Sequence, residues 1–293
     1  MVSAGSKYKH KINEIICQWS YKYKKRALRI LETHQFIGNA TIIYRKYGGV
    51  ISYEINPTTY ERVINRFPDA FNLERILQKG YDLLDFINSY RRESYYPVIL
   101  PNKPSDSLIG IRKLNIYSFD IVDIDPPGSP HEYFPNIFNL LDDNSILFVT
   151  SGSMHYARFN PISAMEPYNI GSNKGLKLTR RLFQDDNILI IGFYIINEGL
   201  KYSILLFPIF IHDYWTRQKG VQRIGFYINK KNNVKNRNKL SECYTYDPIL
   251  KVNILKCSSL KKGSLNLCRF DDTISINMLE DYLISRLNYL SSI

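Results

Sequence analysis

The chain has 293 residues, of which 44% are hydrophobic, so it can bury a full core and is not a disordered tail. Lys and Arg outnumber Asp and Glu by 39 to 27, which gives a net charge of +12 and suits a polyanionic partner better than a small neutral metabolite. The cations gather in two segments: residues 1–30 carry eight Lys or Arg and one acid, and residues 217–239 carry eight and no acid. A solvated basic surface is the plain alternative to two docking patches.

Three sequence features exclude other classes of protein. The N-terminus has no apolar stretch behind its charges, so we expect no secretory signal. The most apolar region, residues 188–211, is interrupted around Asn197 and Gly199 into runs too short to span a bilayer, and we interpret it as two strands of a buried hairpin. The four cysteines lack the paired spacing of zinc sites, so we predict no metal and free thiols in a reducing cytoplasm.

Strands and helices alternate through the first half of the chain. A basic helix over residues 9–23 has Ile12, Ile15, Ile16 and Trp19 on one face. In chain order the pattern then predicts a strand at 29–32, a helix at 39–47 capped by Gly48 and Gly49, a strand at 50–54, helices at 57–66, at 69–79 and from 82, a strand from 119, a helix at 133–141 and a strand at 145–150. Such alternation is typical of a parallel sheet with helices on both faces.

The most informative segment is the predicted strand from residue 119, which ends in Asp125 followed by Pro-Pro-Gly. Open α/β sheets place their ligands at the carboxyl ends of their strands. Two prolines withhold backbone donors and stiffen the exit, so Asp125 and its neighbouring carbonyls should face outward as acceptors for an amino group. An exocyclic base amine has two such N–H bonds. A strand-terminating turn is the ordinary alternative, because Asp-Pro and Pro-Gly are common turn formers.

The spacing of acids and glycine indicates a nucleotide-binding βαβ unit. Glu32 ends the first strand, Gly38 opens the first helix, and Glu54 ends the second strand 22 positions after Glu32. The loop has one glycine and therefore no pyrophosphate cradle, which favours S-adenosylmethionine, an adenosine without phosphates. Glu54 would then bind the ribose hydroxyls, and Asp82, expected after a third strand, would accept from the adenine amino group.

Four segments, at residues 31–44, 54–57, 122–130 and 148–150, occur in the order and spacing of the class I S-adenosylmethionine-dependent methyltransferases. Within that class the chain most resembles the tRNA guanine-N2 dimethyltransferases, whose hallmark is a strand running into Asp-Pro-aromatic-Gly-Ser-Pro. Residues 203–214 are similar to the apolar segment that links the catalytic and C-terminal parts of that family. The chain departs from the family at two places: Asn39 and Ala40 follow the loop glycine where an arginine is common, and Pro127 replaces the aromatic residue.

The resemblance implies an α/β fold: a Rossmann-like class I methyltransferase sheet with helices on both faces, and a small C-terminal α+β extension. We expect a basic helix at 1–26, a catalytic domain at 27–215 and a smaller basic region at 216–293 that docks RNA. The cofactor is expected to contact Glu32, His34, Phe36, Gly38, Glu54, Ile55, Asp82, Leu83 and Asp125.

The implied reaction is methyl transfer to an exocyclic amine of a base, with guanine in tRNA as the first candidate. Asp125 would accept one N–H of the amine and the carbonyl of Pro126 the other, and the base must be flipped or single-stranded. His131, Tyr133 and Phe134 could stack on that base, although Tyr133 and Phe134 fit a helix core better. Because Pro127 resembles the Asp-Pro-Pro loop of adenine-amino methyltransferases, adenine stays open as a target, as do a protein amine and a non-catalytic nucleic-acid-binding protein.

Overall fold

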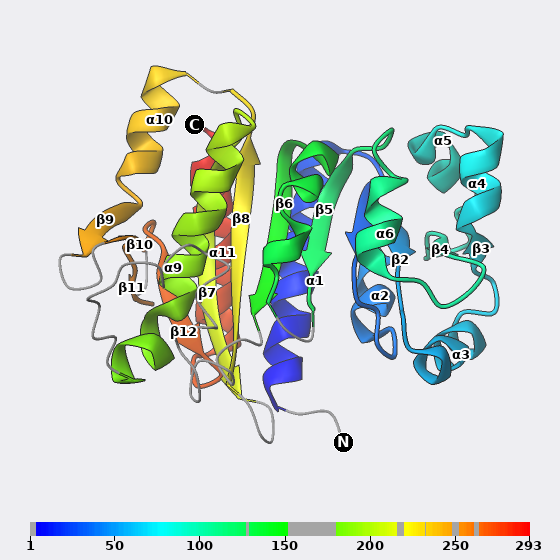
Figure 1. Cartoon of the computed structure of the whole chain (residues 1–293), viewed down its shortest axis with the longest axis horizontal. Helices are drawn as coiled ribbons and strands as arrows, with labels where there is room; N and C mark the ends of the chain where they lie inside the picture. The colour runs from blue at the N-terminus through cyan, green and yellow to red at the C-terminus, as the bar shows by residue number, and fades with distance from the viewer. Residues whose placement is uncertain are drawn as a thin grey trace.

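The computed structural model describes residues 4–126, 129–151, 180–215, 220–231, 233–247, 252–260 and 264–293 (Figure 1). A ten-stranded sheet has the order β11-β12-β7-β8-β6-β5-β1-β2-β4-β3, and β9 pairs with β10 in a separate sheet. The strands are β1 (Leu28–Glu32), β2 (Gly48–Ser52), β3 (Phe71–Asn72), β4 (Val98–Leu100), β5 (Phe119–Ile124), β6 (Leu141–Ser151), β7 (Leu205–Trp215), β8 (Gly220–Asn229), β9 (Tyr244–Asp247), β10 (Val252–Leu255), β11 (Ser258–Ser259) and β12 (Cys268–Asp271).

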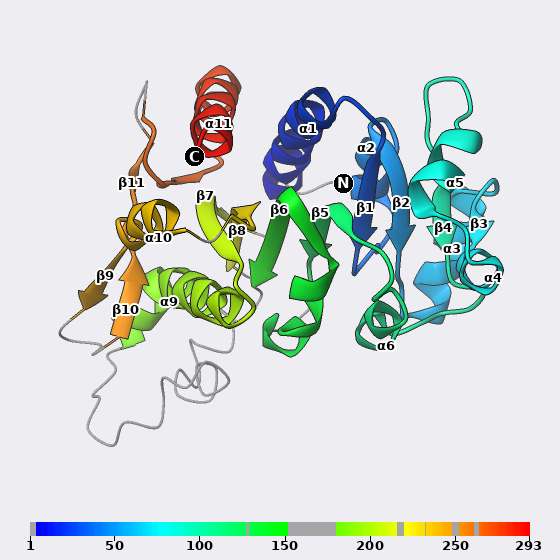
Figure 2. The same cartoon turned by 90° about the horizontal axis from the view of Figure 1, so that it is seen from above.

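Helices cover both faces of the large sheet. In Figure 2, α1, α2 and α11 lie on one face and α6 and α9 on the other. The described helices are α1 (Ala4–Lys24), α2 (Asn39–Tyr44), α3 (Pro57–Arg66), α4 (Leu73–Lys79), α5 (Leu83–Ser89), α6 (Ser107–Arg112), α9 (Arg180–Lys201), α10 (Val234–Ser241) and α11 (Ile276–Ser291), with 3-10 turns at His131–Tyr133 and Asn136–Leu140. The α/β class predicted from the sequence is confirmed, and no described helix is long and apolar enough to cross a membrane.

The sheet is parallel at its centre and changes direction at one side. β4, β2, β1, β5 and β6 run parallel, so the carboxyl ends of β1, β2 and β5 meet at one edge. β8 pairs antiparallel with both β6 and β7, which inserts it between them. β12 and β11 extend the sheet beyond β7. Strand β8 therefore belongs to the same sheet as the predicted catalytic domain, although its residues follow position 215; the domain limits themselves stay a prediction.

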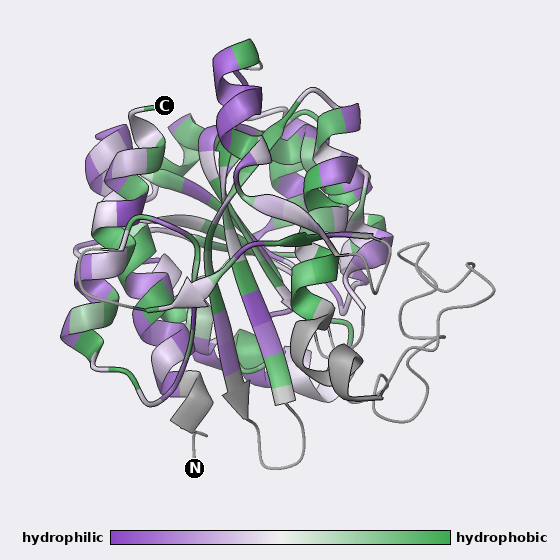
Figure 3. Ribbon diagram, turned by 90° about the vertical axis from the view of Figure 1, so that its left-hand side faces the viewer, coloured by the Kyte–Doolittle hydropathy of each residue, from purple (hydrophilic) through white to green (hydrophobic). Residues whose placement is uncertain are grey.

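The core lies between the sheet and its helices. Ile12, Ile15, Ile16 and Trp19 are buried on the sheet-facing side of α1, as the sequence predicts. Figure 3 shows apolar strands at the centre and helices that alternate between apolar and polar residues. This pattern is what an amphipathic helix over a two-sided buried sheet requires.

Three predicted elements are wrong. The helix from Asn39 ends at Tyr44, and Gly48 and Gly49 belong to β2 instead of capping the helix. A β-carbon on Gly48 would lie 2.0 Å from the carbonyl oxygen of Leu28, so the two glycines permit β2 to approach its neighbours closely. The helix predicted at 133–141 is two 3-10 turns that lead into a long β6.

The third error concerns residues 188–211, where the sequence suggested two strands. The structure has the long helix α9, then a turn, then β7. Buried positions in this part of α9 include 188, 191, 195 and 196, which is helical spacing. In addition, the short helix predicted at 69–79 is preceded by the two-residue strand β3 and spans only α4.

Candidate active site

Glu32 ends β1 and lies almost wholly buried at the edge where the parallel strands finish. Its Oε2 accepts hydrogen bonds from the hydroxyls of Thr41 at 2.6 Å and Ser52 at 3.0 Å. Burial, more than any neighbouring charge, raises the pKa of Glu32 from 4.5 to about 8. Its carboxyl group is therefore mostly protonated near pH 7. Glu32 lines a cavity of about 190 Å³ and so occupies the place predicted for it.

The loop from β1 to α2 bounds this cavity. The Gln35 N–H donates to the carbonyl of Tyr53, and the Gly38 N–H donates to the carbonyl of Gln35. Gly38 has φ 74°, which glycine tolerates best, and a β-carbon there would lie 2.5 Å from the Phe67 ring. Phe36 also has a positive φ, 48°, and its side chain is 51% exposed at the cavity rim. The φ of Gly38 and its close contact with Phe67 explain the glycine within the fold, and the approach of a ligand to this loop stays a prediction.

Asp125 follows β5 directly, but its carboxylate is not open. The side chain is 16% exposed and forms an ion pair with Lys9 of α1. Burial opposes ionisation of Asp125, but Lys9 and Arg223 outweigh it and lower the pKa, so the carboxylate is charged at neutral pH. The expectation of a freely outward-facing acceptor is thus wrong, because an ammonium group from another element already occupies it. Pro126 is buried beside it, and Pro127 and Gly128 lie outside the described residues.

A cluster of buried polar side chains surrounds Asp123, near the carboxyl end of β5. Asp123 Oδ2 accepts from the Tyr44 hydroxyl at 2.6 Å and from an Arg223 Nη at 3.1 Å. Arg223 comes from β8, donates also to Asn13 of α1, and lies over the Phe148 ring. The Arg223 side chain is fully buried, so it cannot contact RNA, although it is one of the eight cations of residues 217–239 that the sequence predicts to dock RNA.

A second cavity of about 380 Å³ adjoins the first and shares His34 with it. One His34 ring nitrogen is 2.9 Å from the Thr33 hydroxyl, and the other is 3.2 Å from the hydroxyl of Tyr133. Burial lowers the pKa of His34, so its ring is neutral near pH 7. Tyr133 and Phe134 are buried, which supports the core alternative, although Tyr133 lines the cavity together with His131.

The remaining predicted cofactor residues divide between this cavity and elsewhere. Ile55 lines it and is 58% exposed. Glu54 lies two residues past β2, half-buried, and its carboxylate accepts from the Asn56 N–H. Asp82 caps α5 and lines neither cavity, and Leu83 is a core residue behind it. The premise that Asp82 follows a third strand is wrong, because the strand beside β2 is β4.

Sequence reasoning missed two residues of this edge. Asp106 lies past β4, caps α6 and lines the larger cavity, which is the place expected of Asp82. β4 has only three residues and lies between prolines, so its sequence shows no alternation of apolar and polar residues from which the strand, and Asp106 after it, could have been predicted. Lys9 was counted only as part of a basic helix. Its position on the same helix face as Ile12 and Ile16 was the available signal that it turns inward.

Among the described residues, no group of three or more His, Cys, Asp or Glu side chains could hold a metal ion. The site consists of two adjoining cavities at the carboxyl ends of β1, β2 and β5. The larger combines apolar side chains with two acids, Asp106 and Glu132, and the smaller is lined by Lys9, Glu32 and Asp125.

No protein-family model matches the sequence, and no curated protein does. Among solved structures, the chain is similar to Trm1 from Pyrococcus horikoshii in complex with S-adenosyl-L-methionine, with a TM-score of 0.51 and 13% identity over 87% of this chain and 64% of that one. The O-methyltransferase TomG from Streptomyces achromogenes has a TM-score of 0.44 and 14% identity over 78% of this chain and 82% of that one. By its strand order and its likeness to the first of these, the chain has the class I S-adenosylmethionine-dependent methyltransferase fold.

Proposed function

We propose that this protein is an S-adenosylmethionine-dependent methyltransferase that acts on an exocyclic amine of a nucleic-acid base, with guanine in tRNA as the first candidate. The observation that carries the proposal is Asp125: an acid at the carboxyl end of a central strand, between two cavities, whose carboxylate holds the amino group of Lys9. A group that binds one amine by ion pairing and hydrogen bonding has the acceptor chemistry to orient another.

The two cavities match the two halves of the cofactor. The larger one combines the apolar side chains of Ile55 and Leu108 with the acid Asp106, which suits a flat purine with an amino group. Glu54 at its border is the proposed acceptor for the ribose hydroxyls. The smaller one has charged walls and only one glycine in its loop, which suits a methionine tail and not a phosphate.

The protonation states of the groups around the smaller cavity leave Lys9 as its cationic side chain. Burial, together with Lys9 and Arg223, lowers the pKa of His10, so Lys9 is the lining cation at neutral pH. Glu32 is mostly protonated there, and Asp125 is ionised. We propose that Lys9 binds the carboxylate of the methionine moiety, in the role of the arginine that the resemblance leads one to expect near Asn39. Its departure would leave Asp125 available to the target amine.

Residues of the chain then orient the target amine and hold the site in place. When bound, the cofactor supplies a methyl group already activated by its sulfonium. Asp125 accepts a hydrogen bond from the target amine and orients its lone pair, and the buried cluster of Asp123, Tyr44 and Arg223 holds the end of β5 in place. Positioning of this kind supplies most of the rate in a reaction whose donor is already activated.

The deciding experiment is nucleoside mass spectrometry after incubation of the protein with isotopically labelled S-adenosylmethionine and, in parallel, tRNA, single-stranded DNA and a protein substrate mixture. We expect label in methylated guanosine from tRNA, and about a hundredfold less label per unit time when Asp125→Ala replaces the wild type. Label in adenosine or in protein would shift the substrate class. Failure of S-adenosylmethionine to bind in calorimetry would contradict the proposed function.

A further inference from the structure

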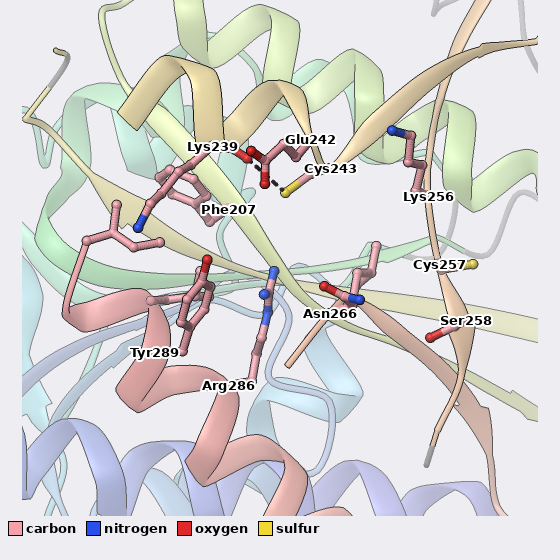
Figure 4. Close-up of a pocket in the computed structure, with 13 residues that line it drawn as sticks. Phe207, Lys239, Glu242, Cys243, Lys256, Cys257, Ser258, Asn266, Arg286 and Tyr289 are labelled. Atoms are coloured by element: carbon pink, nitrogen blue, oxygen red, sulfur yellow. Dashed lines mark hydrogen bonds between the residues drawn. The ribbon is translucent and has the colours of Figure 1, made fainter. Parts of the chain in front are cut away.

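A third cavity, of about 300 Å³, lies far from Asp125, in the C-terminal part of the chain (Figure 4). It is enclosed by the ends of α10 and α11, by β11 and by the beginning of β7. β7 runs in the same direction as β6, because each pairs antiparallel with β8, so Phe207 near its start lies at the amino-terminal edge of the sheet. Asp125 follows the carboxyl end of β5, at the opposite edge.

The floor of the cavity holds a buried arginine without a counter-ion. Arg286 of α11 is 4% exposed, and its Nη groups donate to the carbonyls of Leu265 and Pro208. Its Nε has no hydrogen-bond partner among the described residues, and no carboxylate there forms an ion pair with it. A buried guanidinium is costly unless it is paired. Arg286 nevertheless lines the cavity and keeps its positive charge there.

Other cations and an aromatic ring share the cavity with Arg286. The Lys239 ammonium lies 5.5 Å from the centre of the Tyr289 ring and the Arg286 guanidinium 5.7 Å from it. Figure 4 shows Arg286 and Tyr289 extending from α11 toward the end of α10, which bears Lys239. Lys256 lines the cavity from the segment before β11.

These positive charges are not neutralised locally. Glu242 lines the cavity but is exposed, and among the described residues it forms no ion pair with Lys239, Lys256 or Arg286. The Cys243 thiol adds no negative charge, because burial raises its pKa and keeps it protonated near pH 7. Three cationic side chains thus share a space of small-molecule size with one acidic side chain, Glu242, and with Ile293, the last residue of the sequence.

We propose that this cavity binds a phosphomonoester, with the phosphate on Arg286, Lys239 and Lys256 and the organic part beside the Tyr289 ring. A phosphomonoester carries about −1.5 to −2 charges at pH 7, which matches the excess of cations. Its oxygens accept hydrogen bonds from the guanidinium and ammonium groups, and the Tyr289 ring, which both Lys239 and Arg286 approach, bounds the space beside them. The ligand is either a free nucleotide or the terminal phosphate of an RNA. This inference does not depend on the proposed methyl transfer.

Calorimetry with the full chain tests it, with pyrimidine ligands chosen to avoid the adenosine cavity. We expect uridine monophosphate to bind and uridine to fail. Lys256→Gln and Arg286→Lys should each weaken binding about tenfold or more, as loss of a charge-assisted contact does. Lys235→Gln, which removes the same charge from an exposed position of α10, is the matched control and should bind as the wild type does.

Two further experiments decide whether the phosphate comes from RNA or from a free nucleotide, and replace a variant that fails to fold. A short oligoribonucleotide with and without a 5′-phosphate separates RNA from a free nucleotide: preference for the phosphorylated oligomer over the monophosphate assigns the site to RNA ends. If Arg286→Lys unfolds, the double variant Lys239→Gln/Lys256→Gln takes its place, since neither side chain is buried. Equal affinity for uridine and its monophosphate, or wild-type affinity in that double variant, would overturn the proposal.

Discussion

Asp125 is the residue on which the proposed chemistry rests most directly. We expect Asp125→Ala to lower turnover on RNA about a hundredfold or more while cofactor affinity changes little, because the lost contact is made to the target amine in the transition state. Asp125→Asn keeps one acceptor and should retain more activity than the alanine variant. Steady-state kinetics with calorimetry for the cofactor measures both. Full activity in Asp125→Ala would refute this role, and lost cofactor binding alone would move Asp125 into the cofactor site.

Substitution of Lys9 tests how the smaller cavity recognises the cofactor. If its ammonium binds the methionine carboxylate, Lys9→Met should weaken S-adenosylmethionine about tenfold or more, the usual effect of a lost charge-assisted hydrogen bond. Affinity for 5′-methylthioadenosine, which has no carboxylate, should stay near that of the wild type. Lys22→Met removes an exposed lysine from the same helix and serves as control. An equal loss for both ligands would show that Lys9 only supports the fold.

Glu32 makes stability depend on pH in an unusual direction. Its pKa is raised from 4.5 to about 8 in the folded chain, mainly by burial, so the folded state binds the extra proton between these values. The contribution of Glu32 to the stability of the fold is therefore most favourable below pH 4.5. It decreases as the pH rises toward 8. One pKa unit corresponds to about 1.4 kcal/mol, so the decrease amounts to a few kcal/mol.

The neutral isostere Glu32→Gln should remove this dependence. Its amide oxygen can accept from Thr41 and Ser52 as the protonated acid does, so we expect the variant to exceed the wild type in free energy of unfolding at pH 8 and to differ less at pH 5. Urea denaturation without cofactor, at a series of pH values, measures it. Identical pH profiles would mean that Glu32 is ionised in the folded chain.

At this scale the sequence predicted acids better than it predicted their partners. Glu32 and Asp125 are found at strand ends, and Gly38 at the start of α2, because the ends of these elements can be recognised from their own residues. Lys9 and Arg223 come from elements about 100 residues away from Asp125, and only the folded chain brings them together. An arginine inside an apolar strand such as β8 was the one local signal of a buried partner.

Among the elements, the glycines of β2 show what a local pattern cannot decide. Two glycines after a helical pattern indicate a C-cap, but here they allow close packing of β2 against β1 and α5. In Gly48→Ala the new methyl group would meet the Leu28 backbone, which cannot rotate away, so we expect a loss of about 3 kcal/mol.

The matched control is Gly80→Ala, at the real left-handed C-cap of α4, where φ is 63° and a β-carbon meets nothing within 4 Å. That change should cost only about 1 kcal/mol for the backbone conformation. Urea denaturation compares the two variants. A smaller loss at Gly48 than at Gly80 would contradict the close approach of β1 and β2.

Helix α9 shows the same limit for apolar runs. Its centre consists of Ile and Leu residues that suit strands by composition, and Asn197 to Gly199 suits a turn. The helical spacing of its buried residues was present in the sequence, but an unbroken apolar run satisfies a strand as well. Tertiary contacts decide: a β-carbon on Gly192 would lie 2.5 Å from Leu255, so the helix packs closely on β10.

On the scale of the whole molecule, the described cations of the two basic segments do not gather into one surface at the active edge. Lys9 pairs with Asp125 there, and Arg217 and Lys219 of the second segment lie outside the described residues. Of the eight cations in residues 1–30, five form ion pairs: Lys9, Lys11, Lys24, Arg26 and Arg29. Lys230 lies beside Asp143 at the start of β6, so α10 and its neighbours are at the edge opposite to Asp125. β6 is 11 residues long, and a strand rises about 3.3 Å per residue, so the two edges are separated by about 36 Å.

A large RNA can span that distance, and this gives the last prediction. If the α10 side docks RNA, the quadruple variant Lys230→Gln/Lys231→Gln/Lys235→Gln/Arg237→Gln should weaken tRNA binding and flatten its dependence on salt. Each lost phosphate contact lowers the slope of log affinity against log salt by about 0.7–0.9. Turnover at saturating tRNA should stay unchanged, because all four residues are remote from Asp125. The matched control neutralises Arg62, Arg75, Lys79 and Lys103, four exposed cations at the β3 side of the sheet, with the same loss of charge. Equal slopes in the two variants would show that only the net charge of the molecule attracts RNA, and that α10 has no docking role.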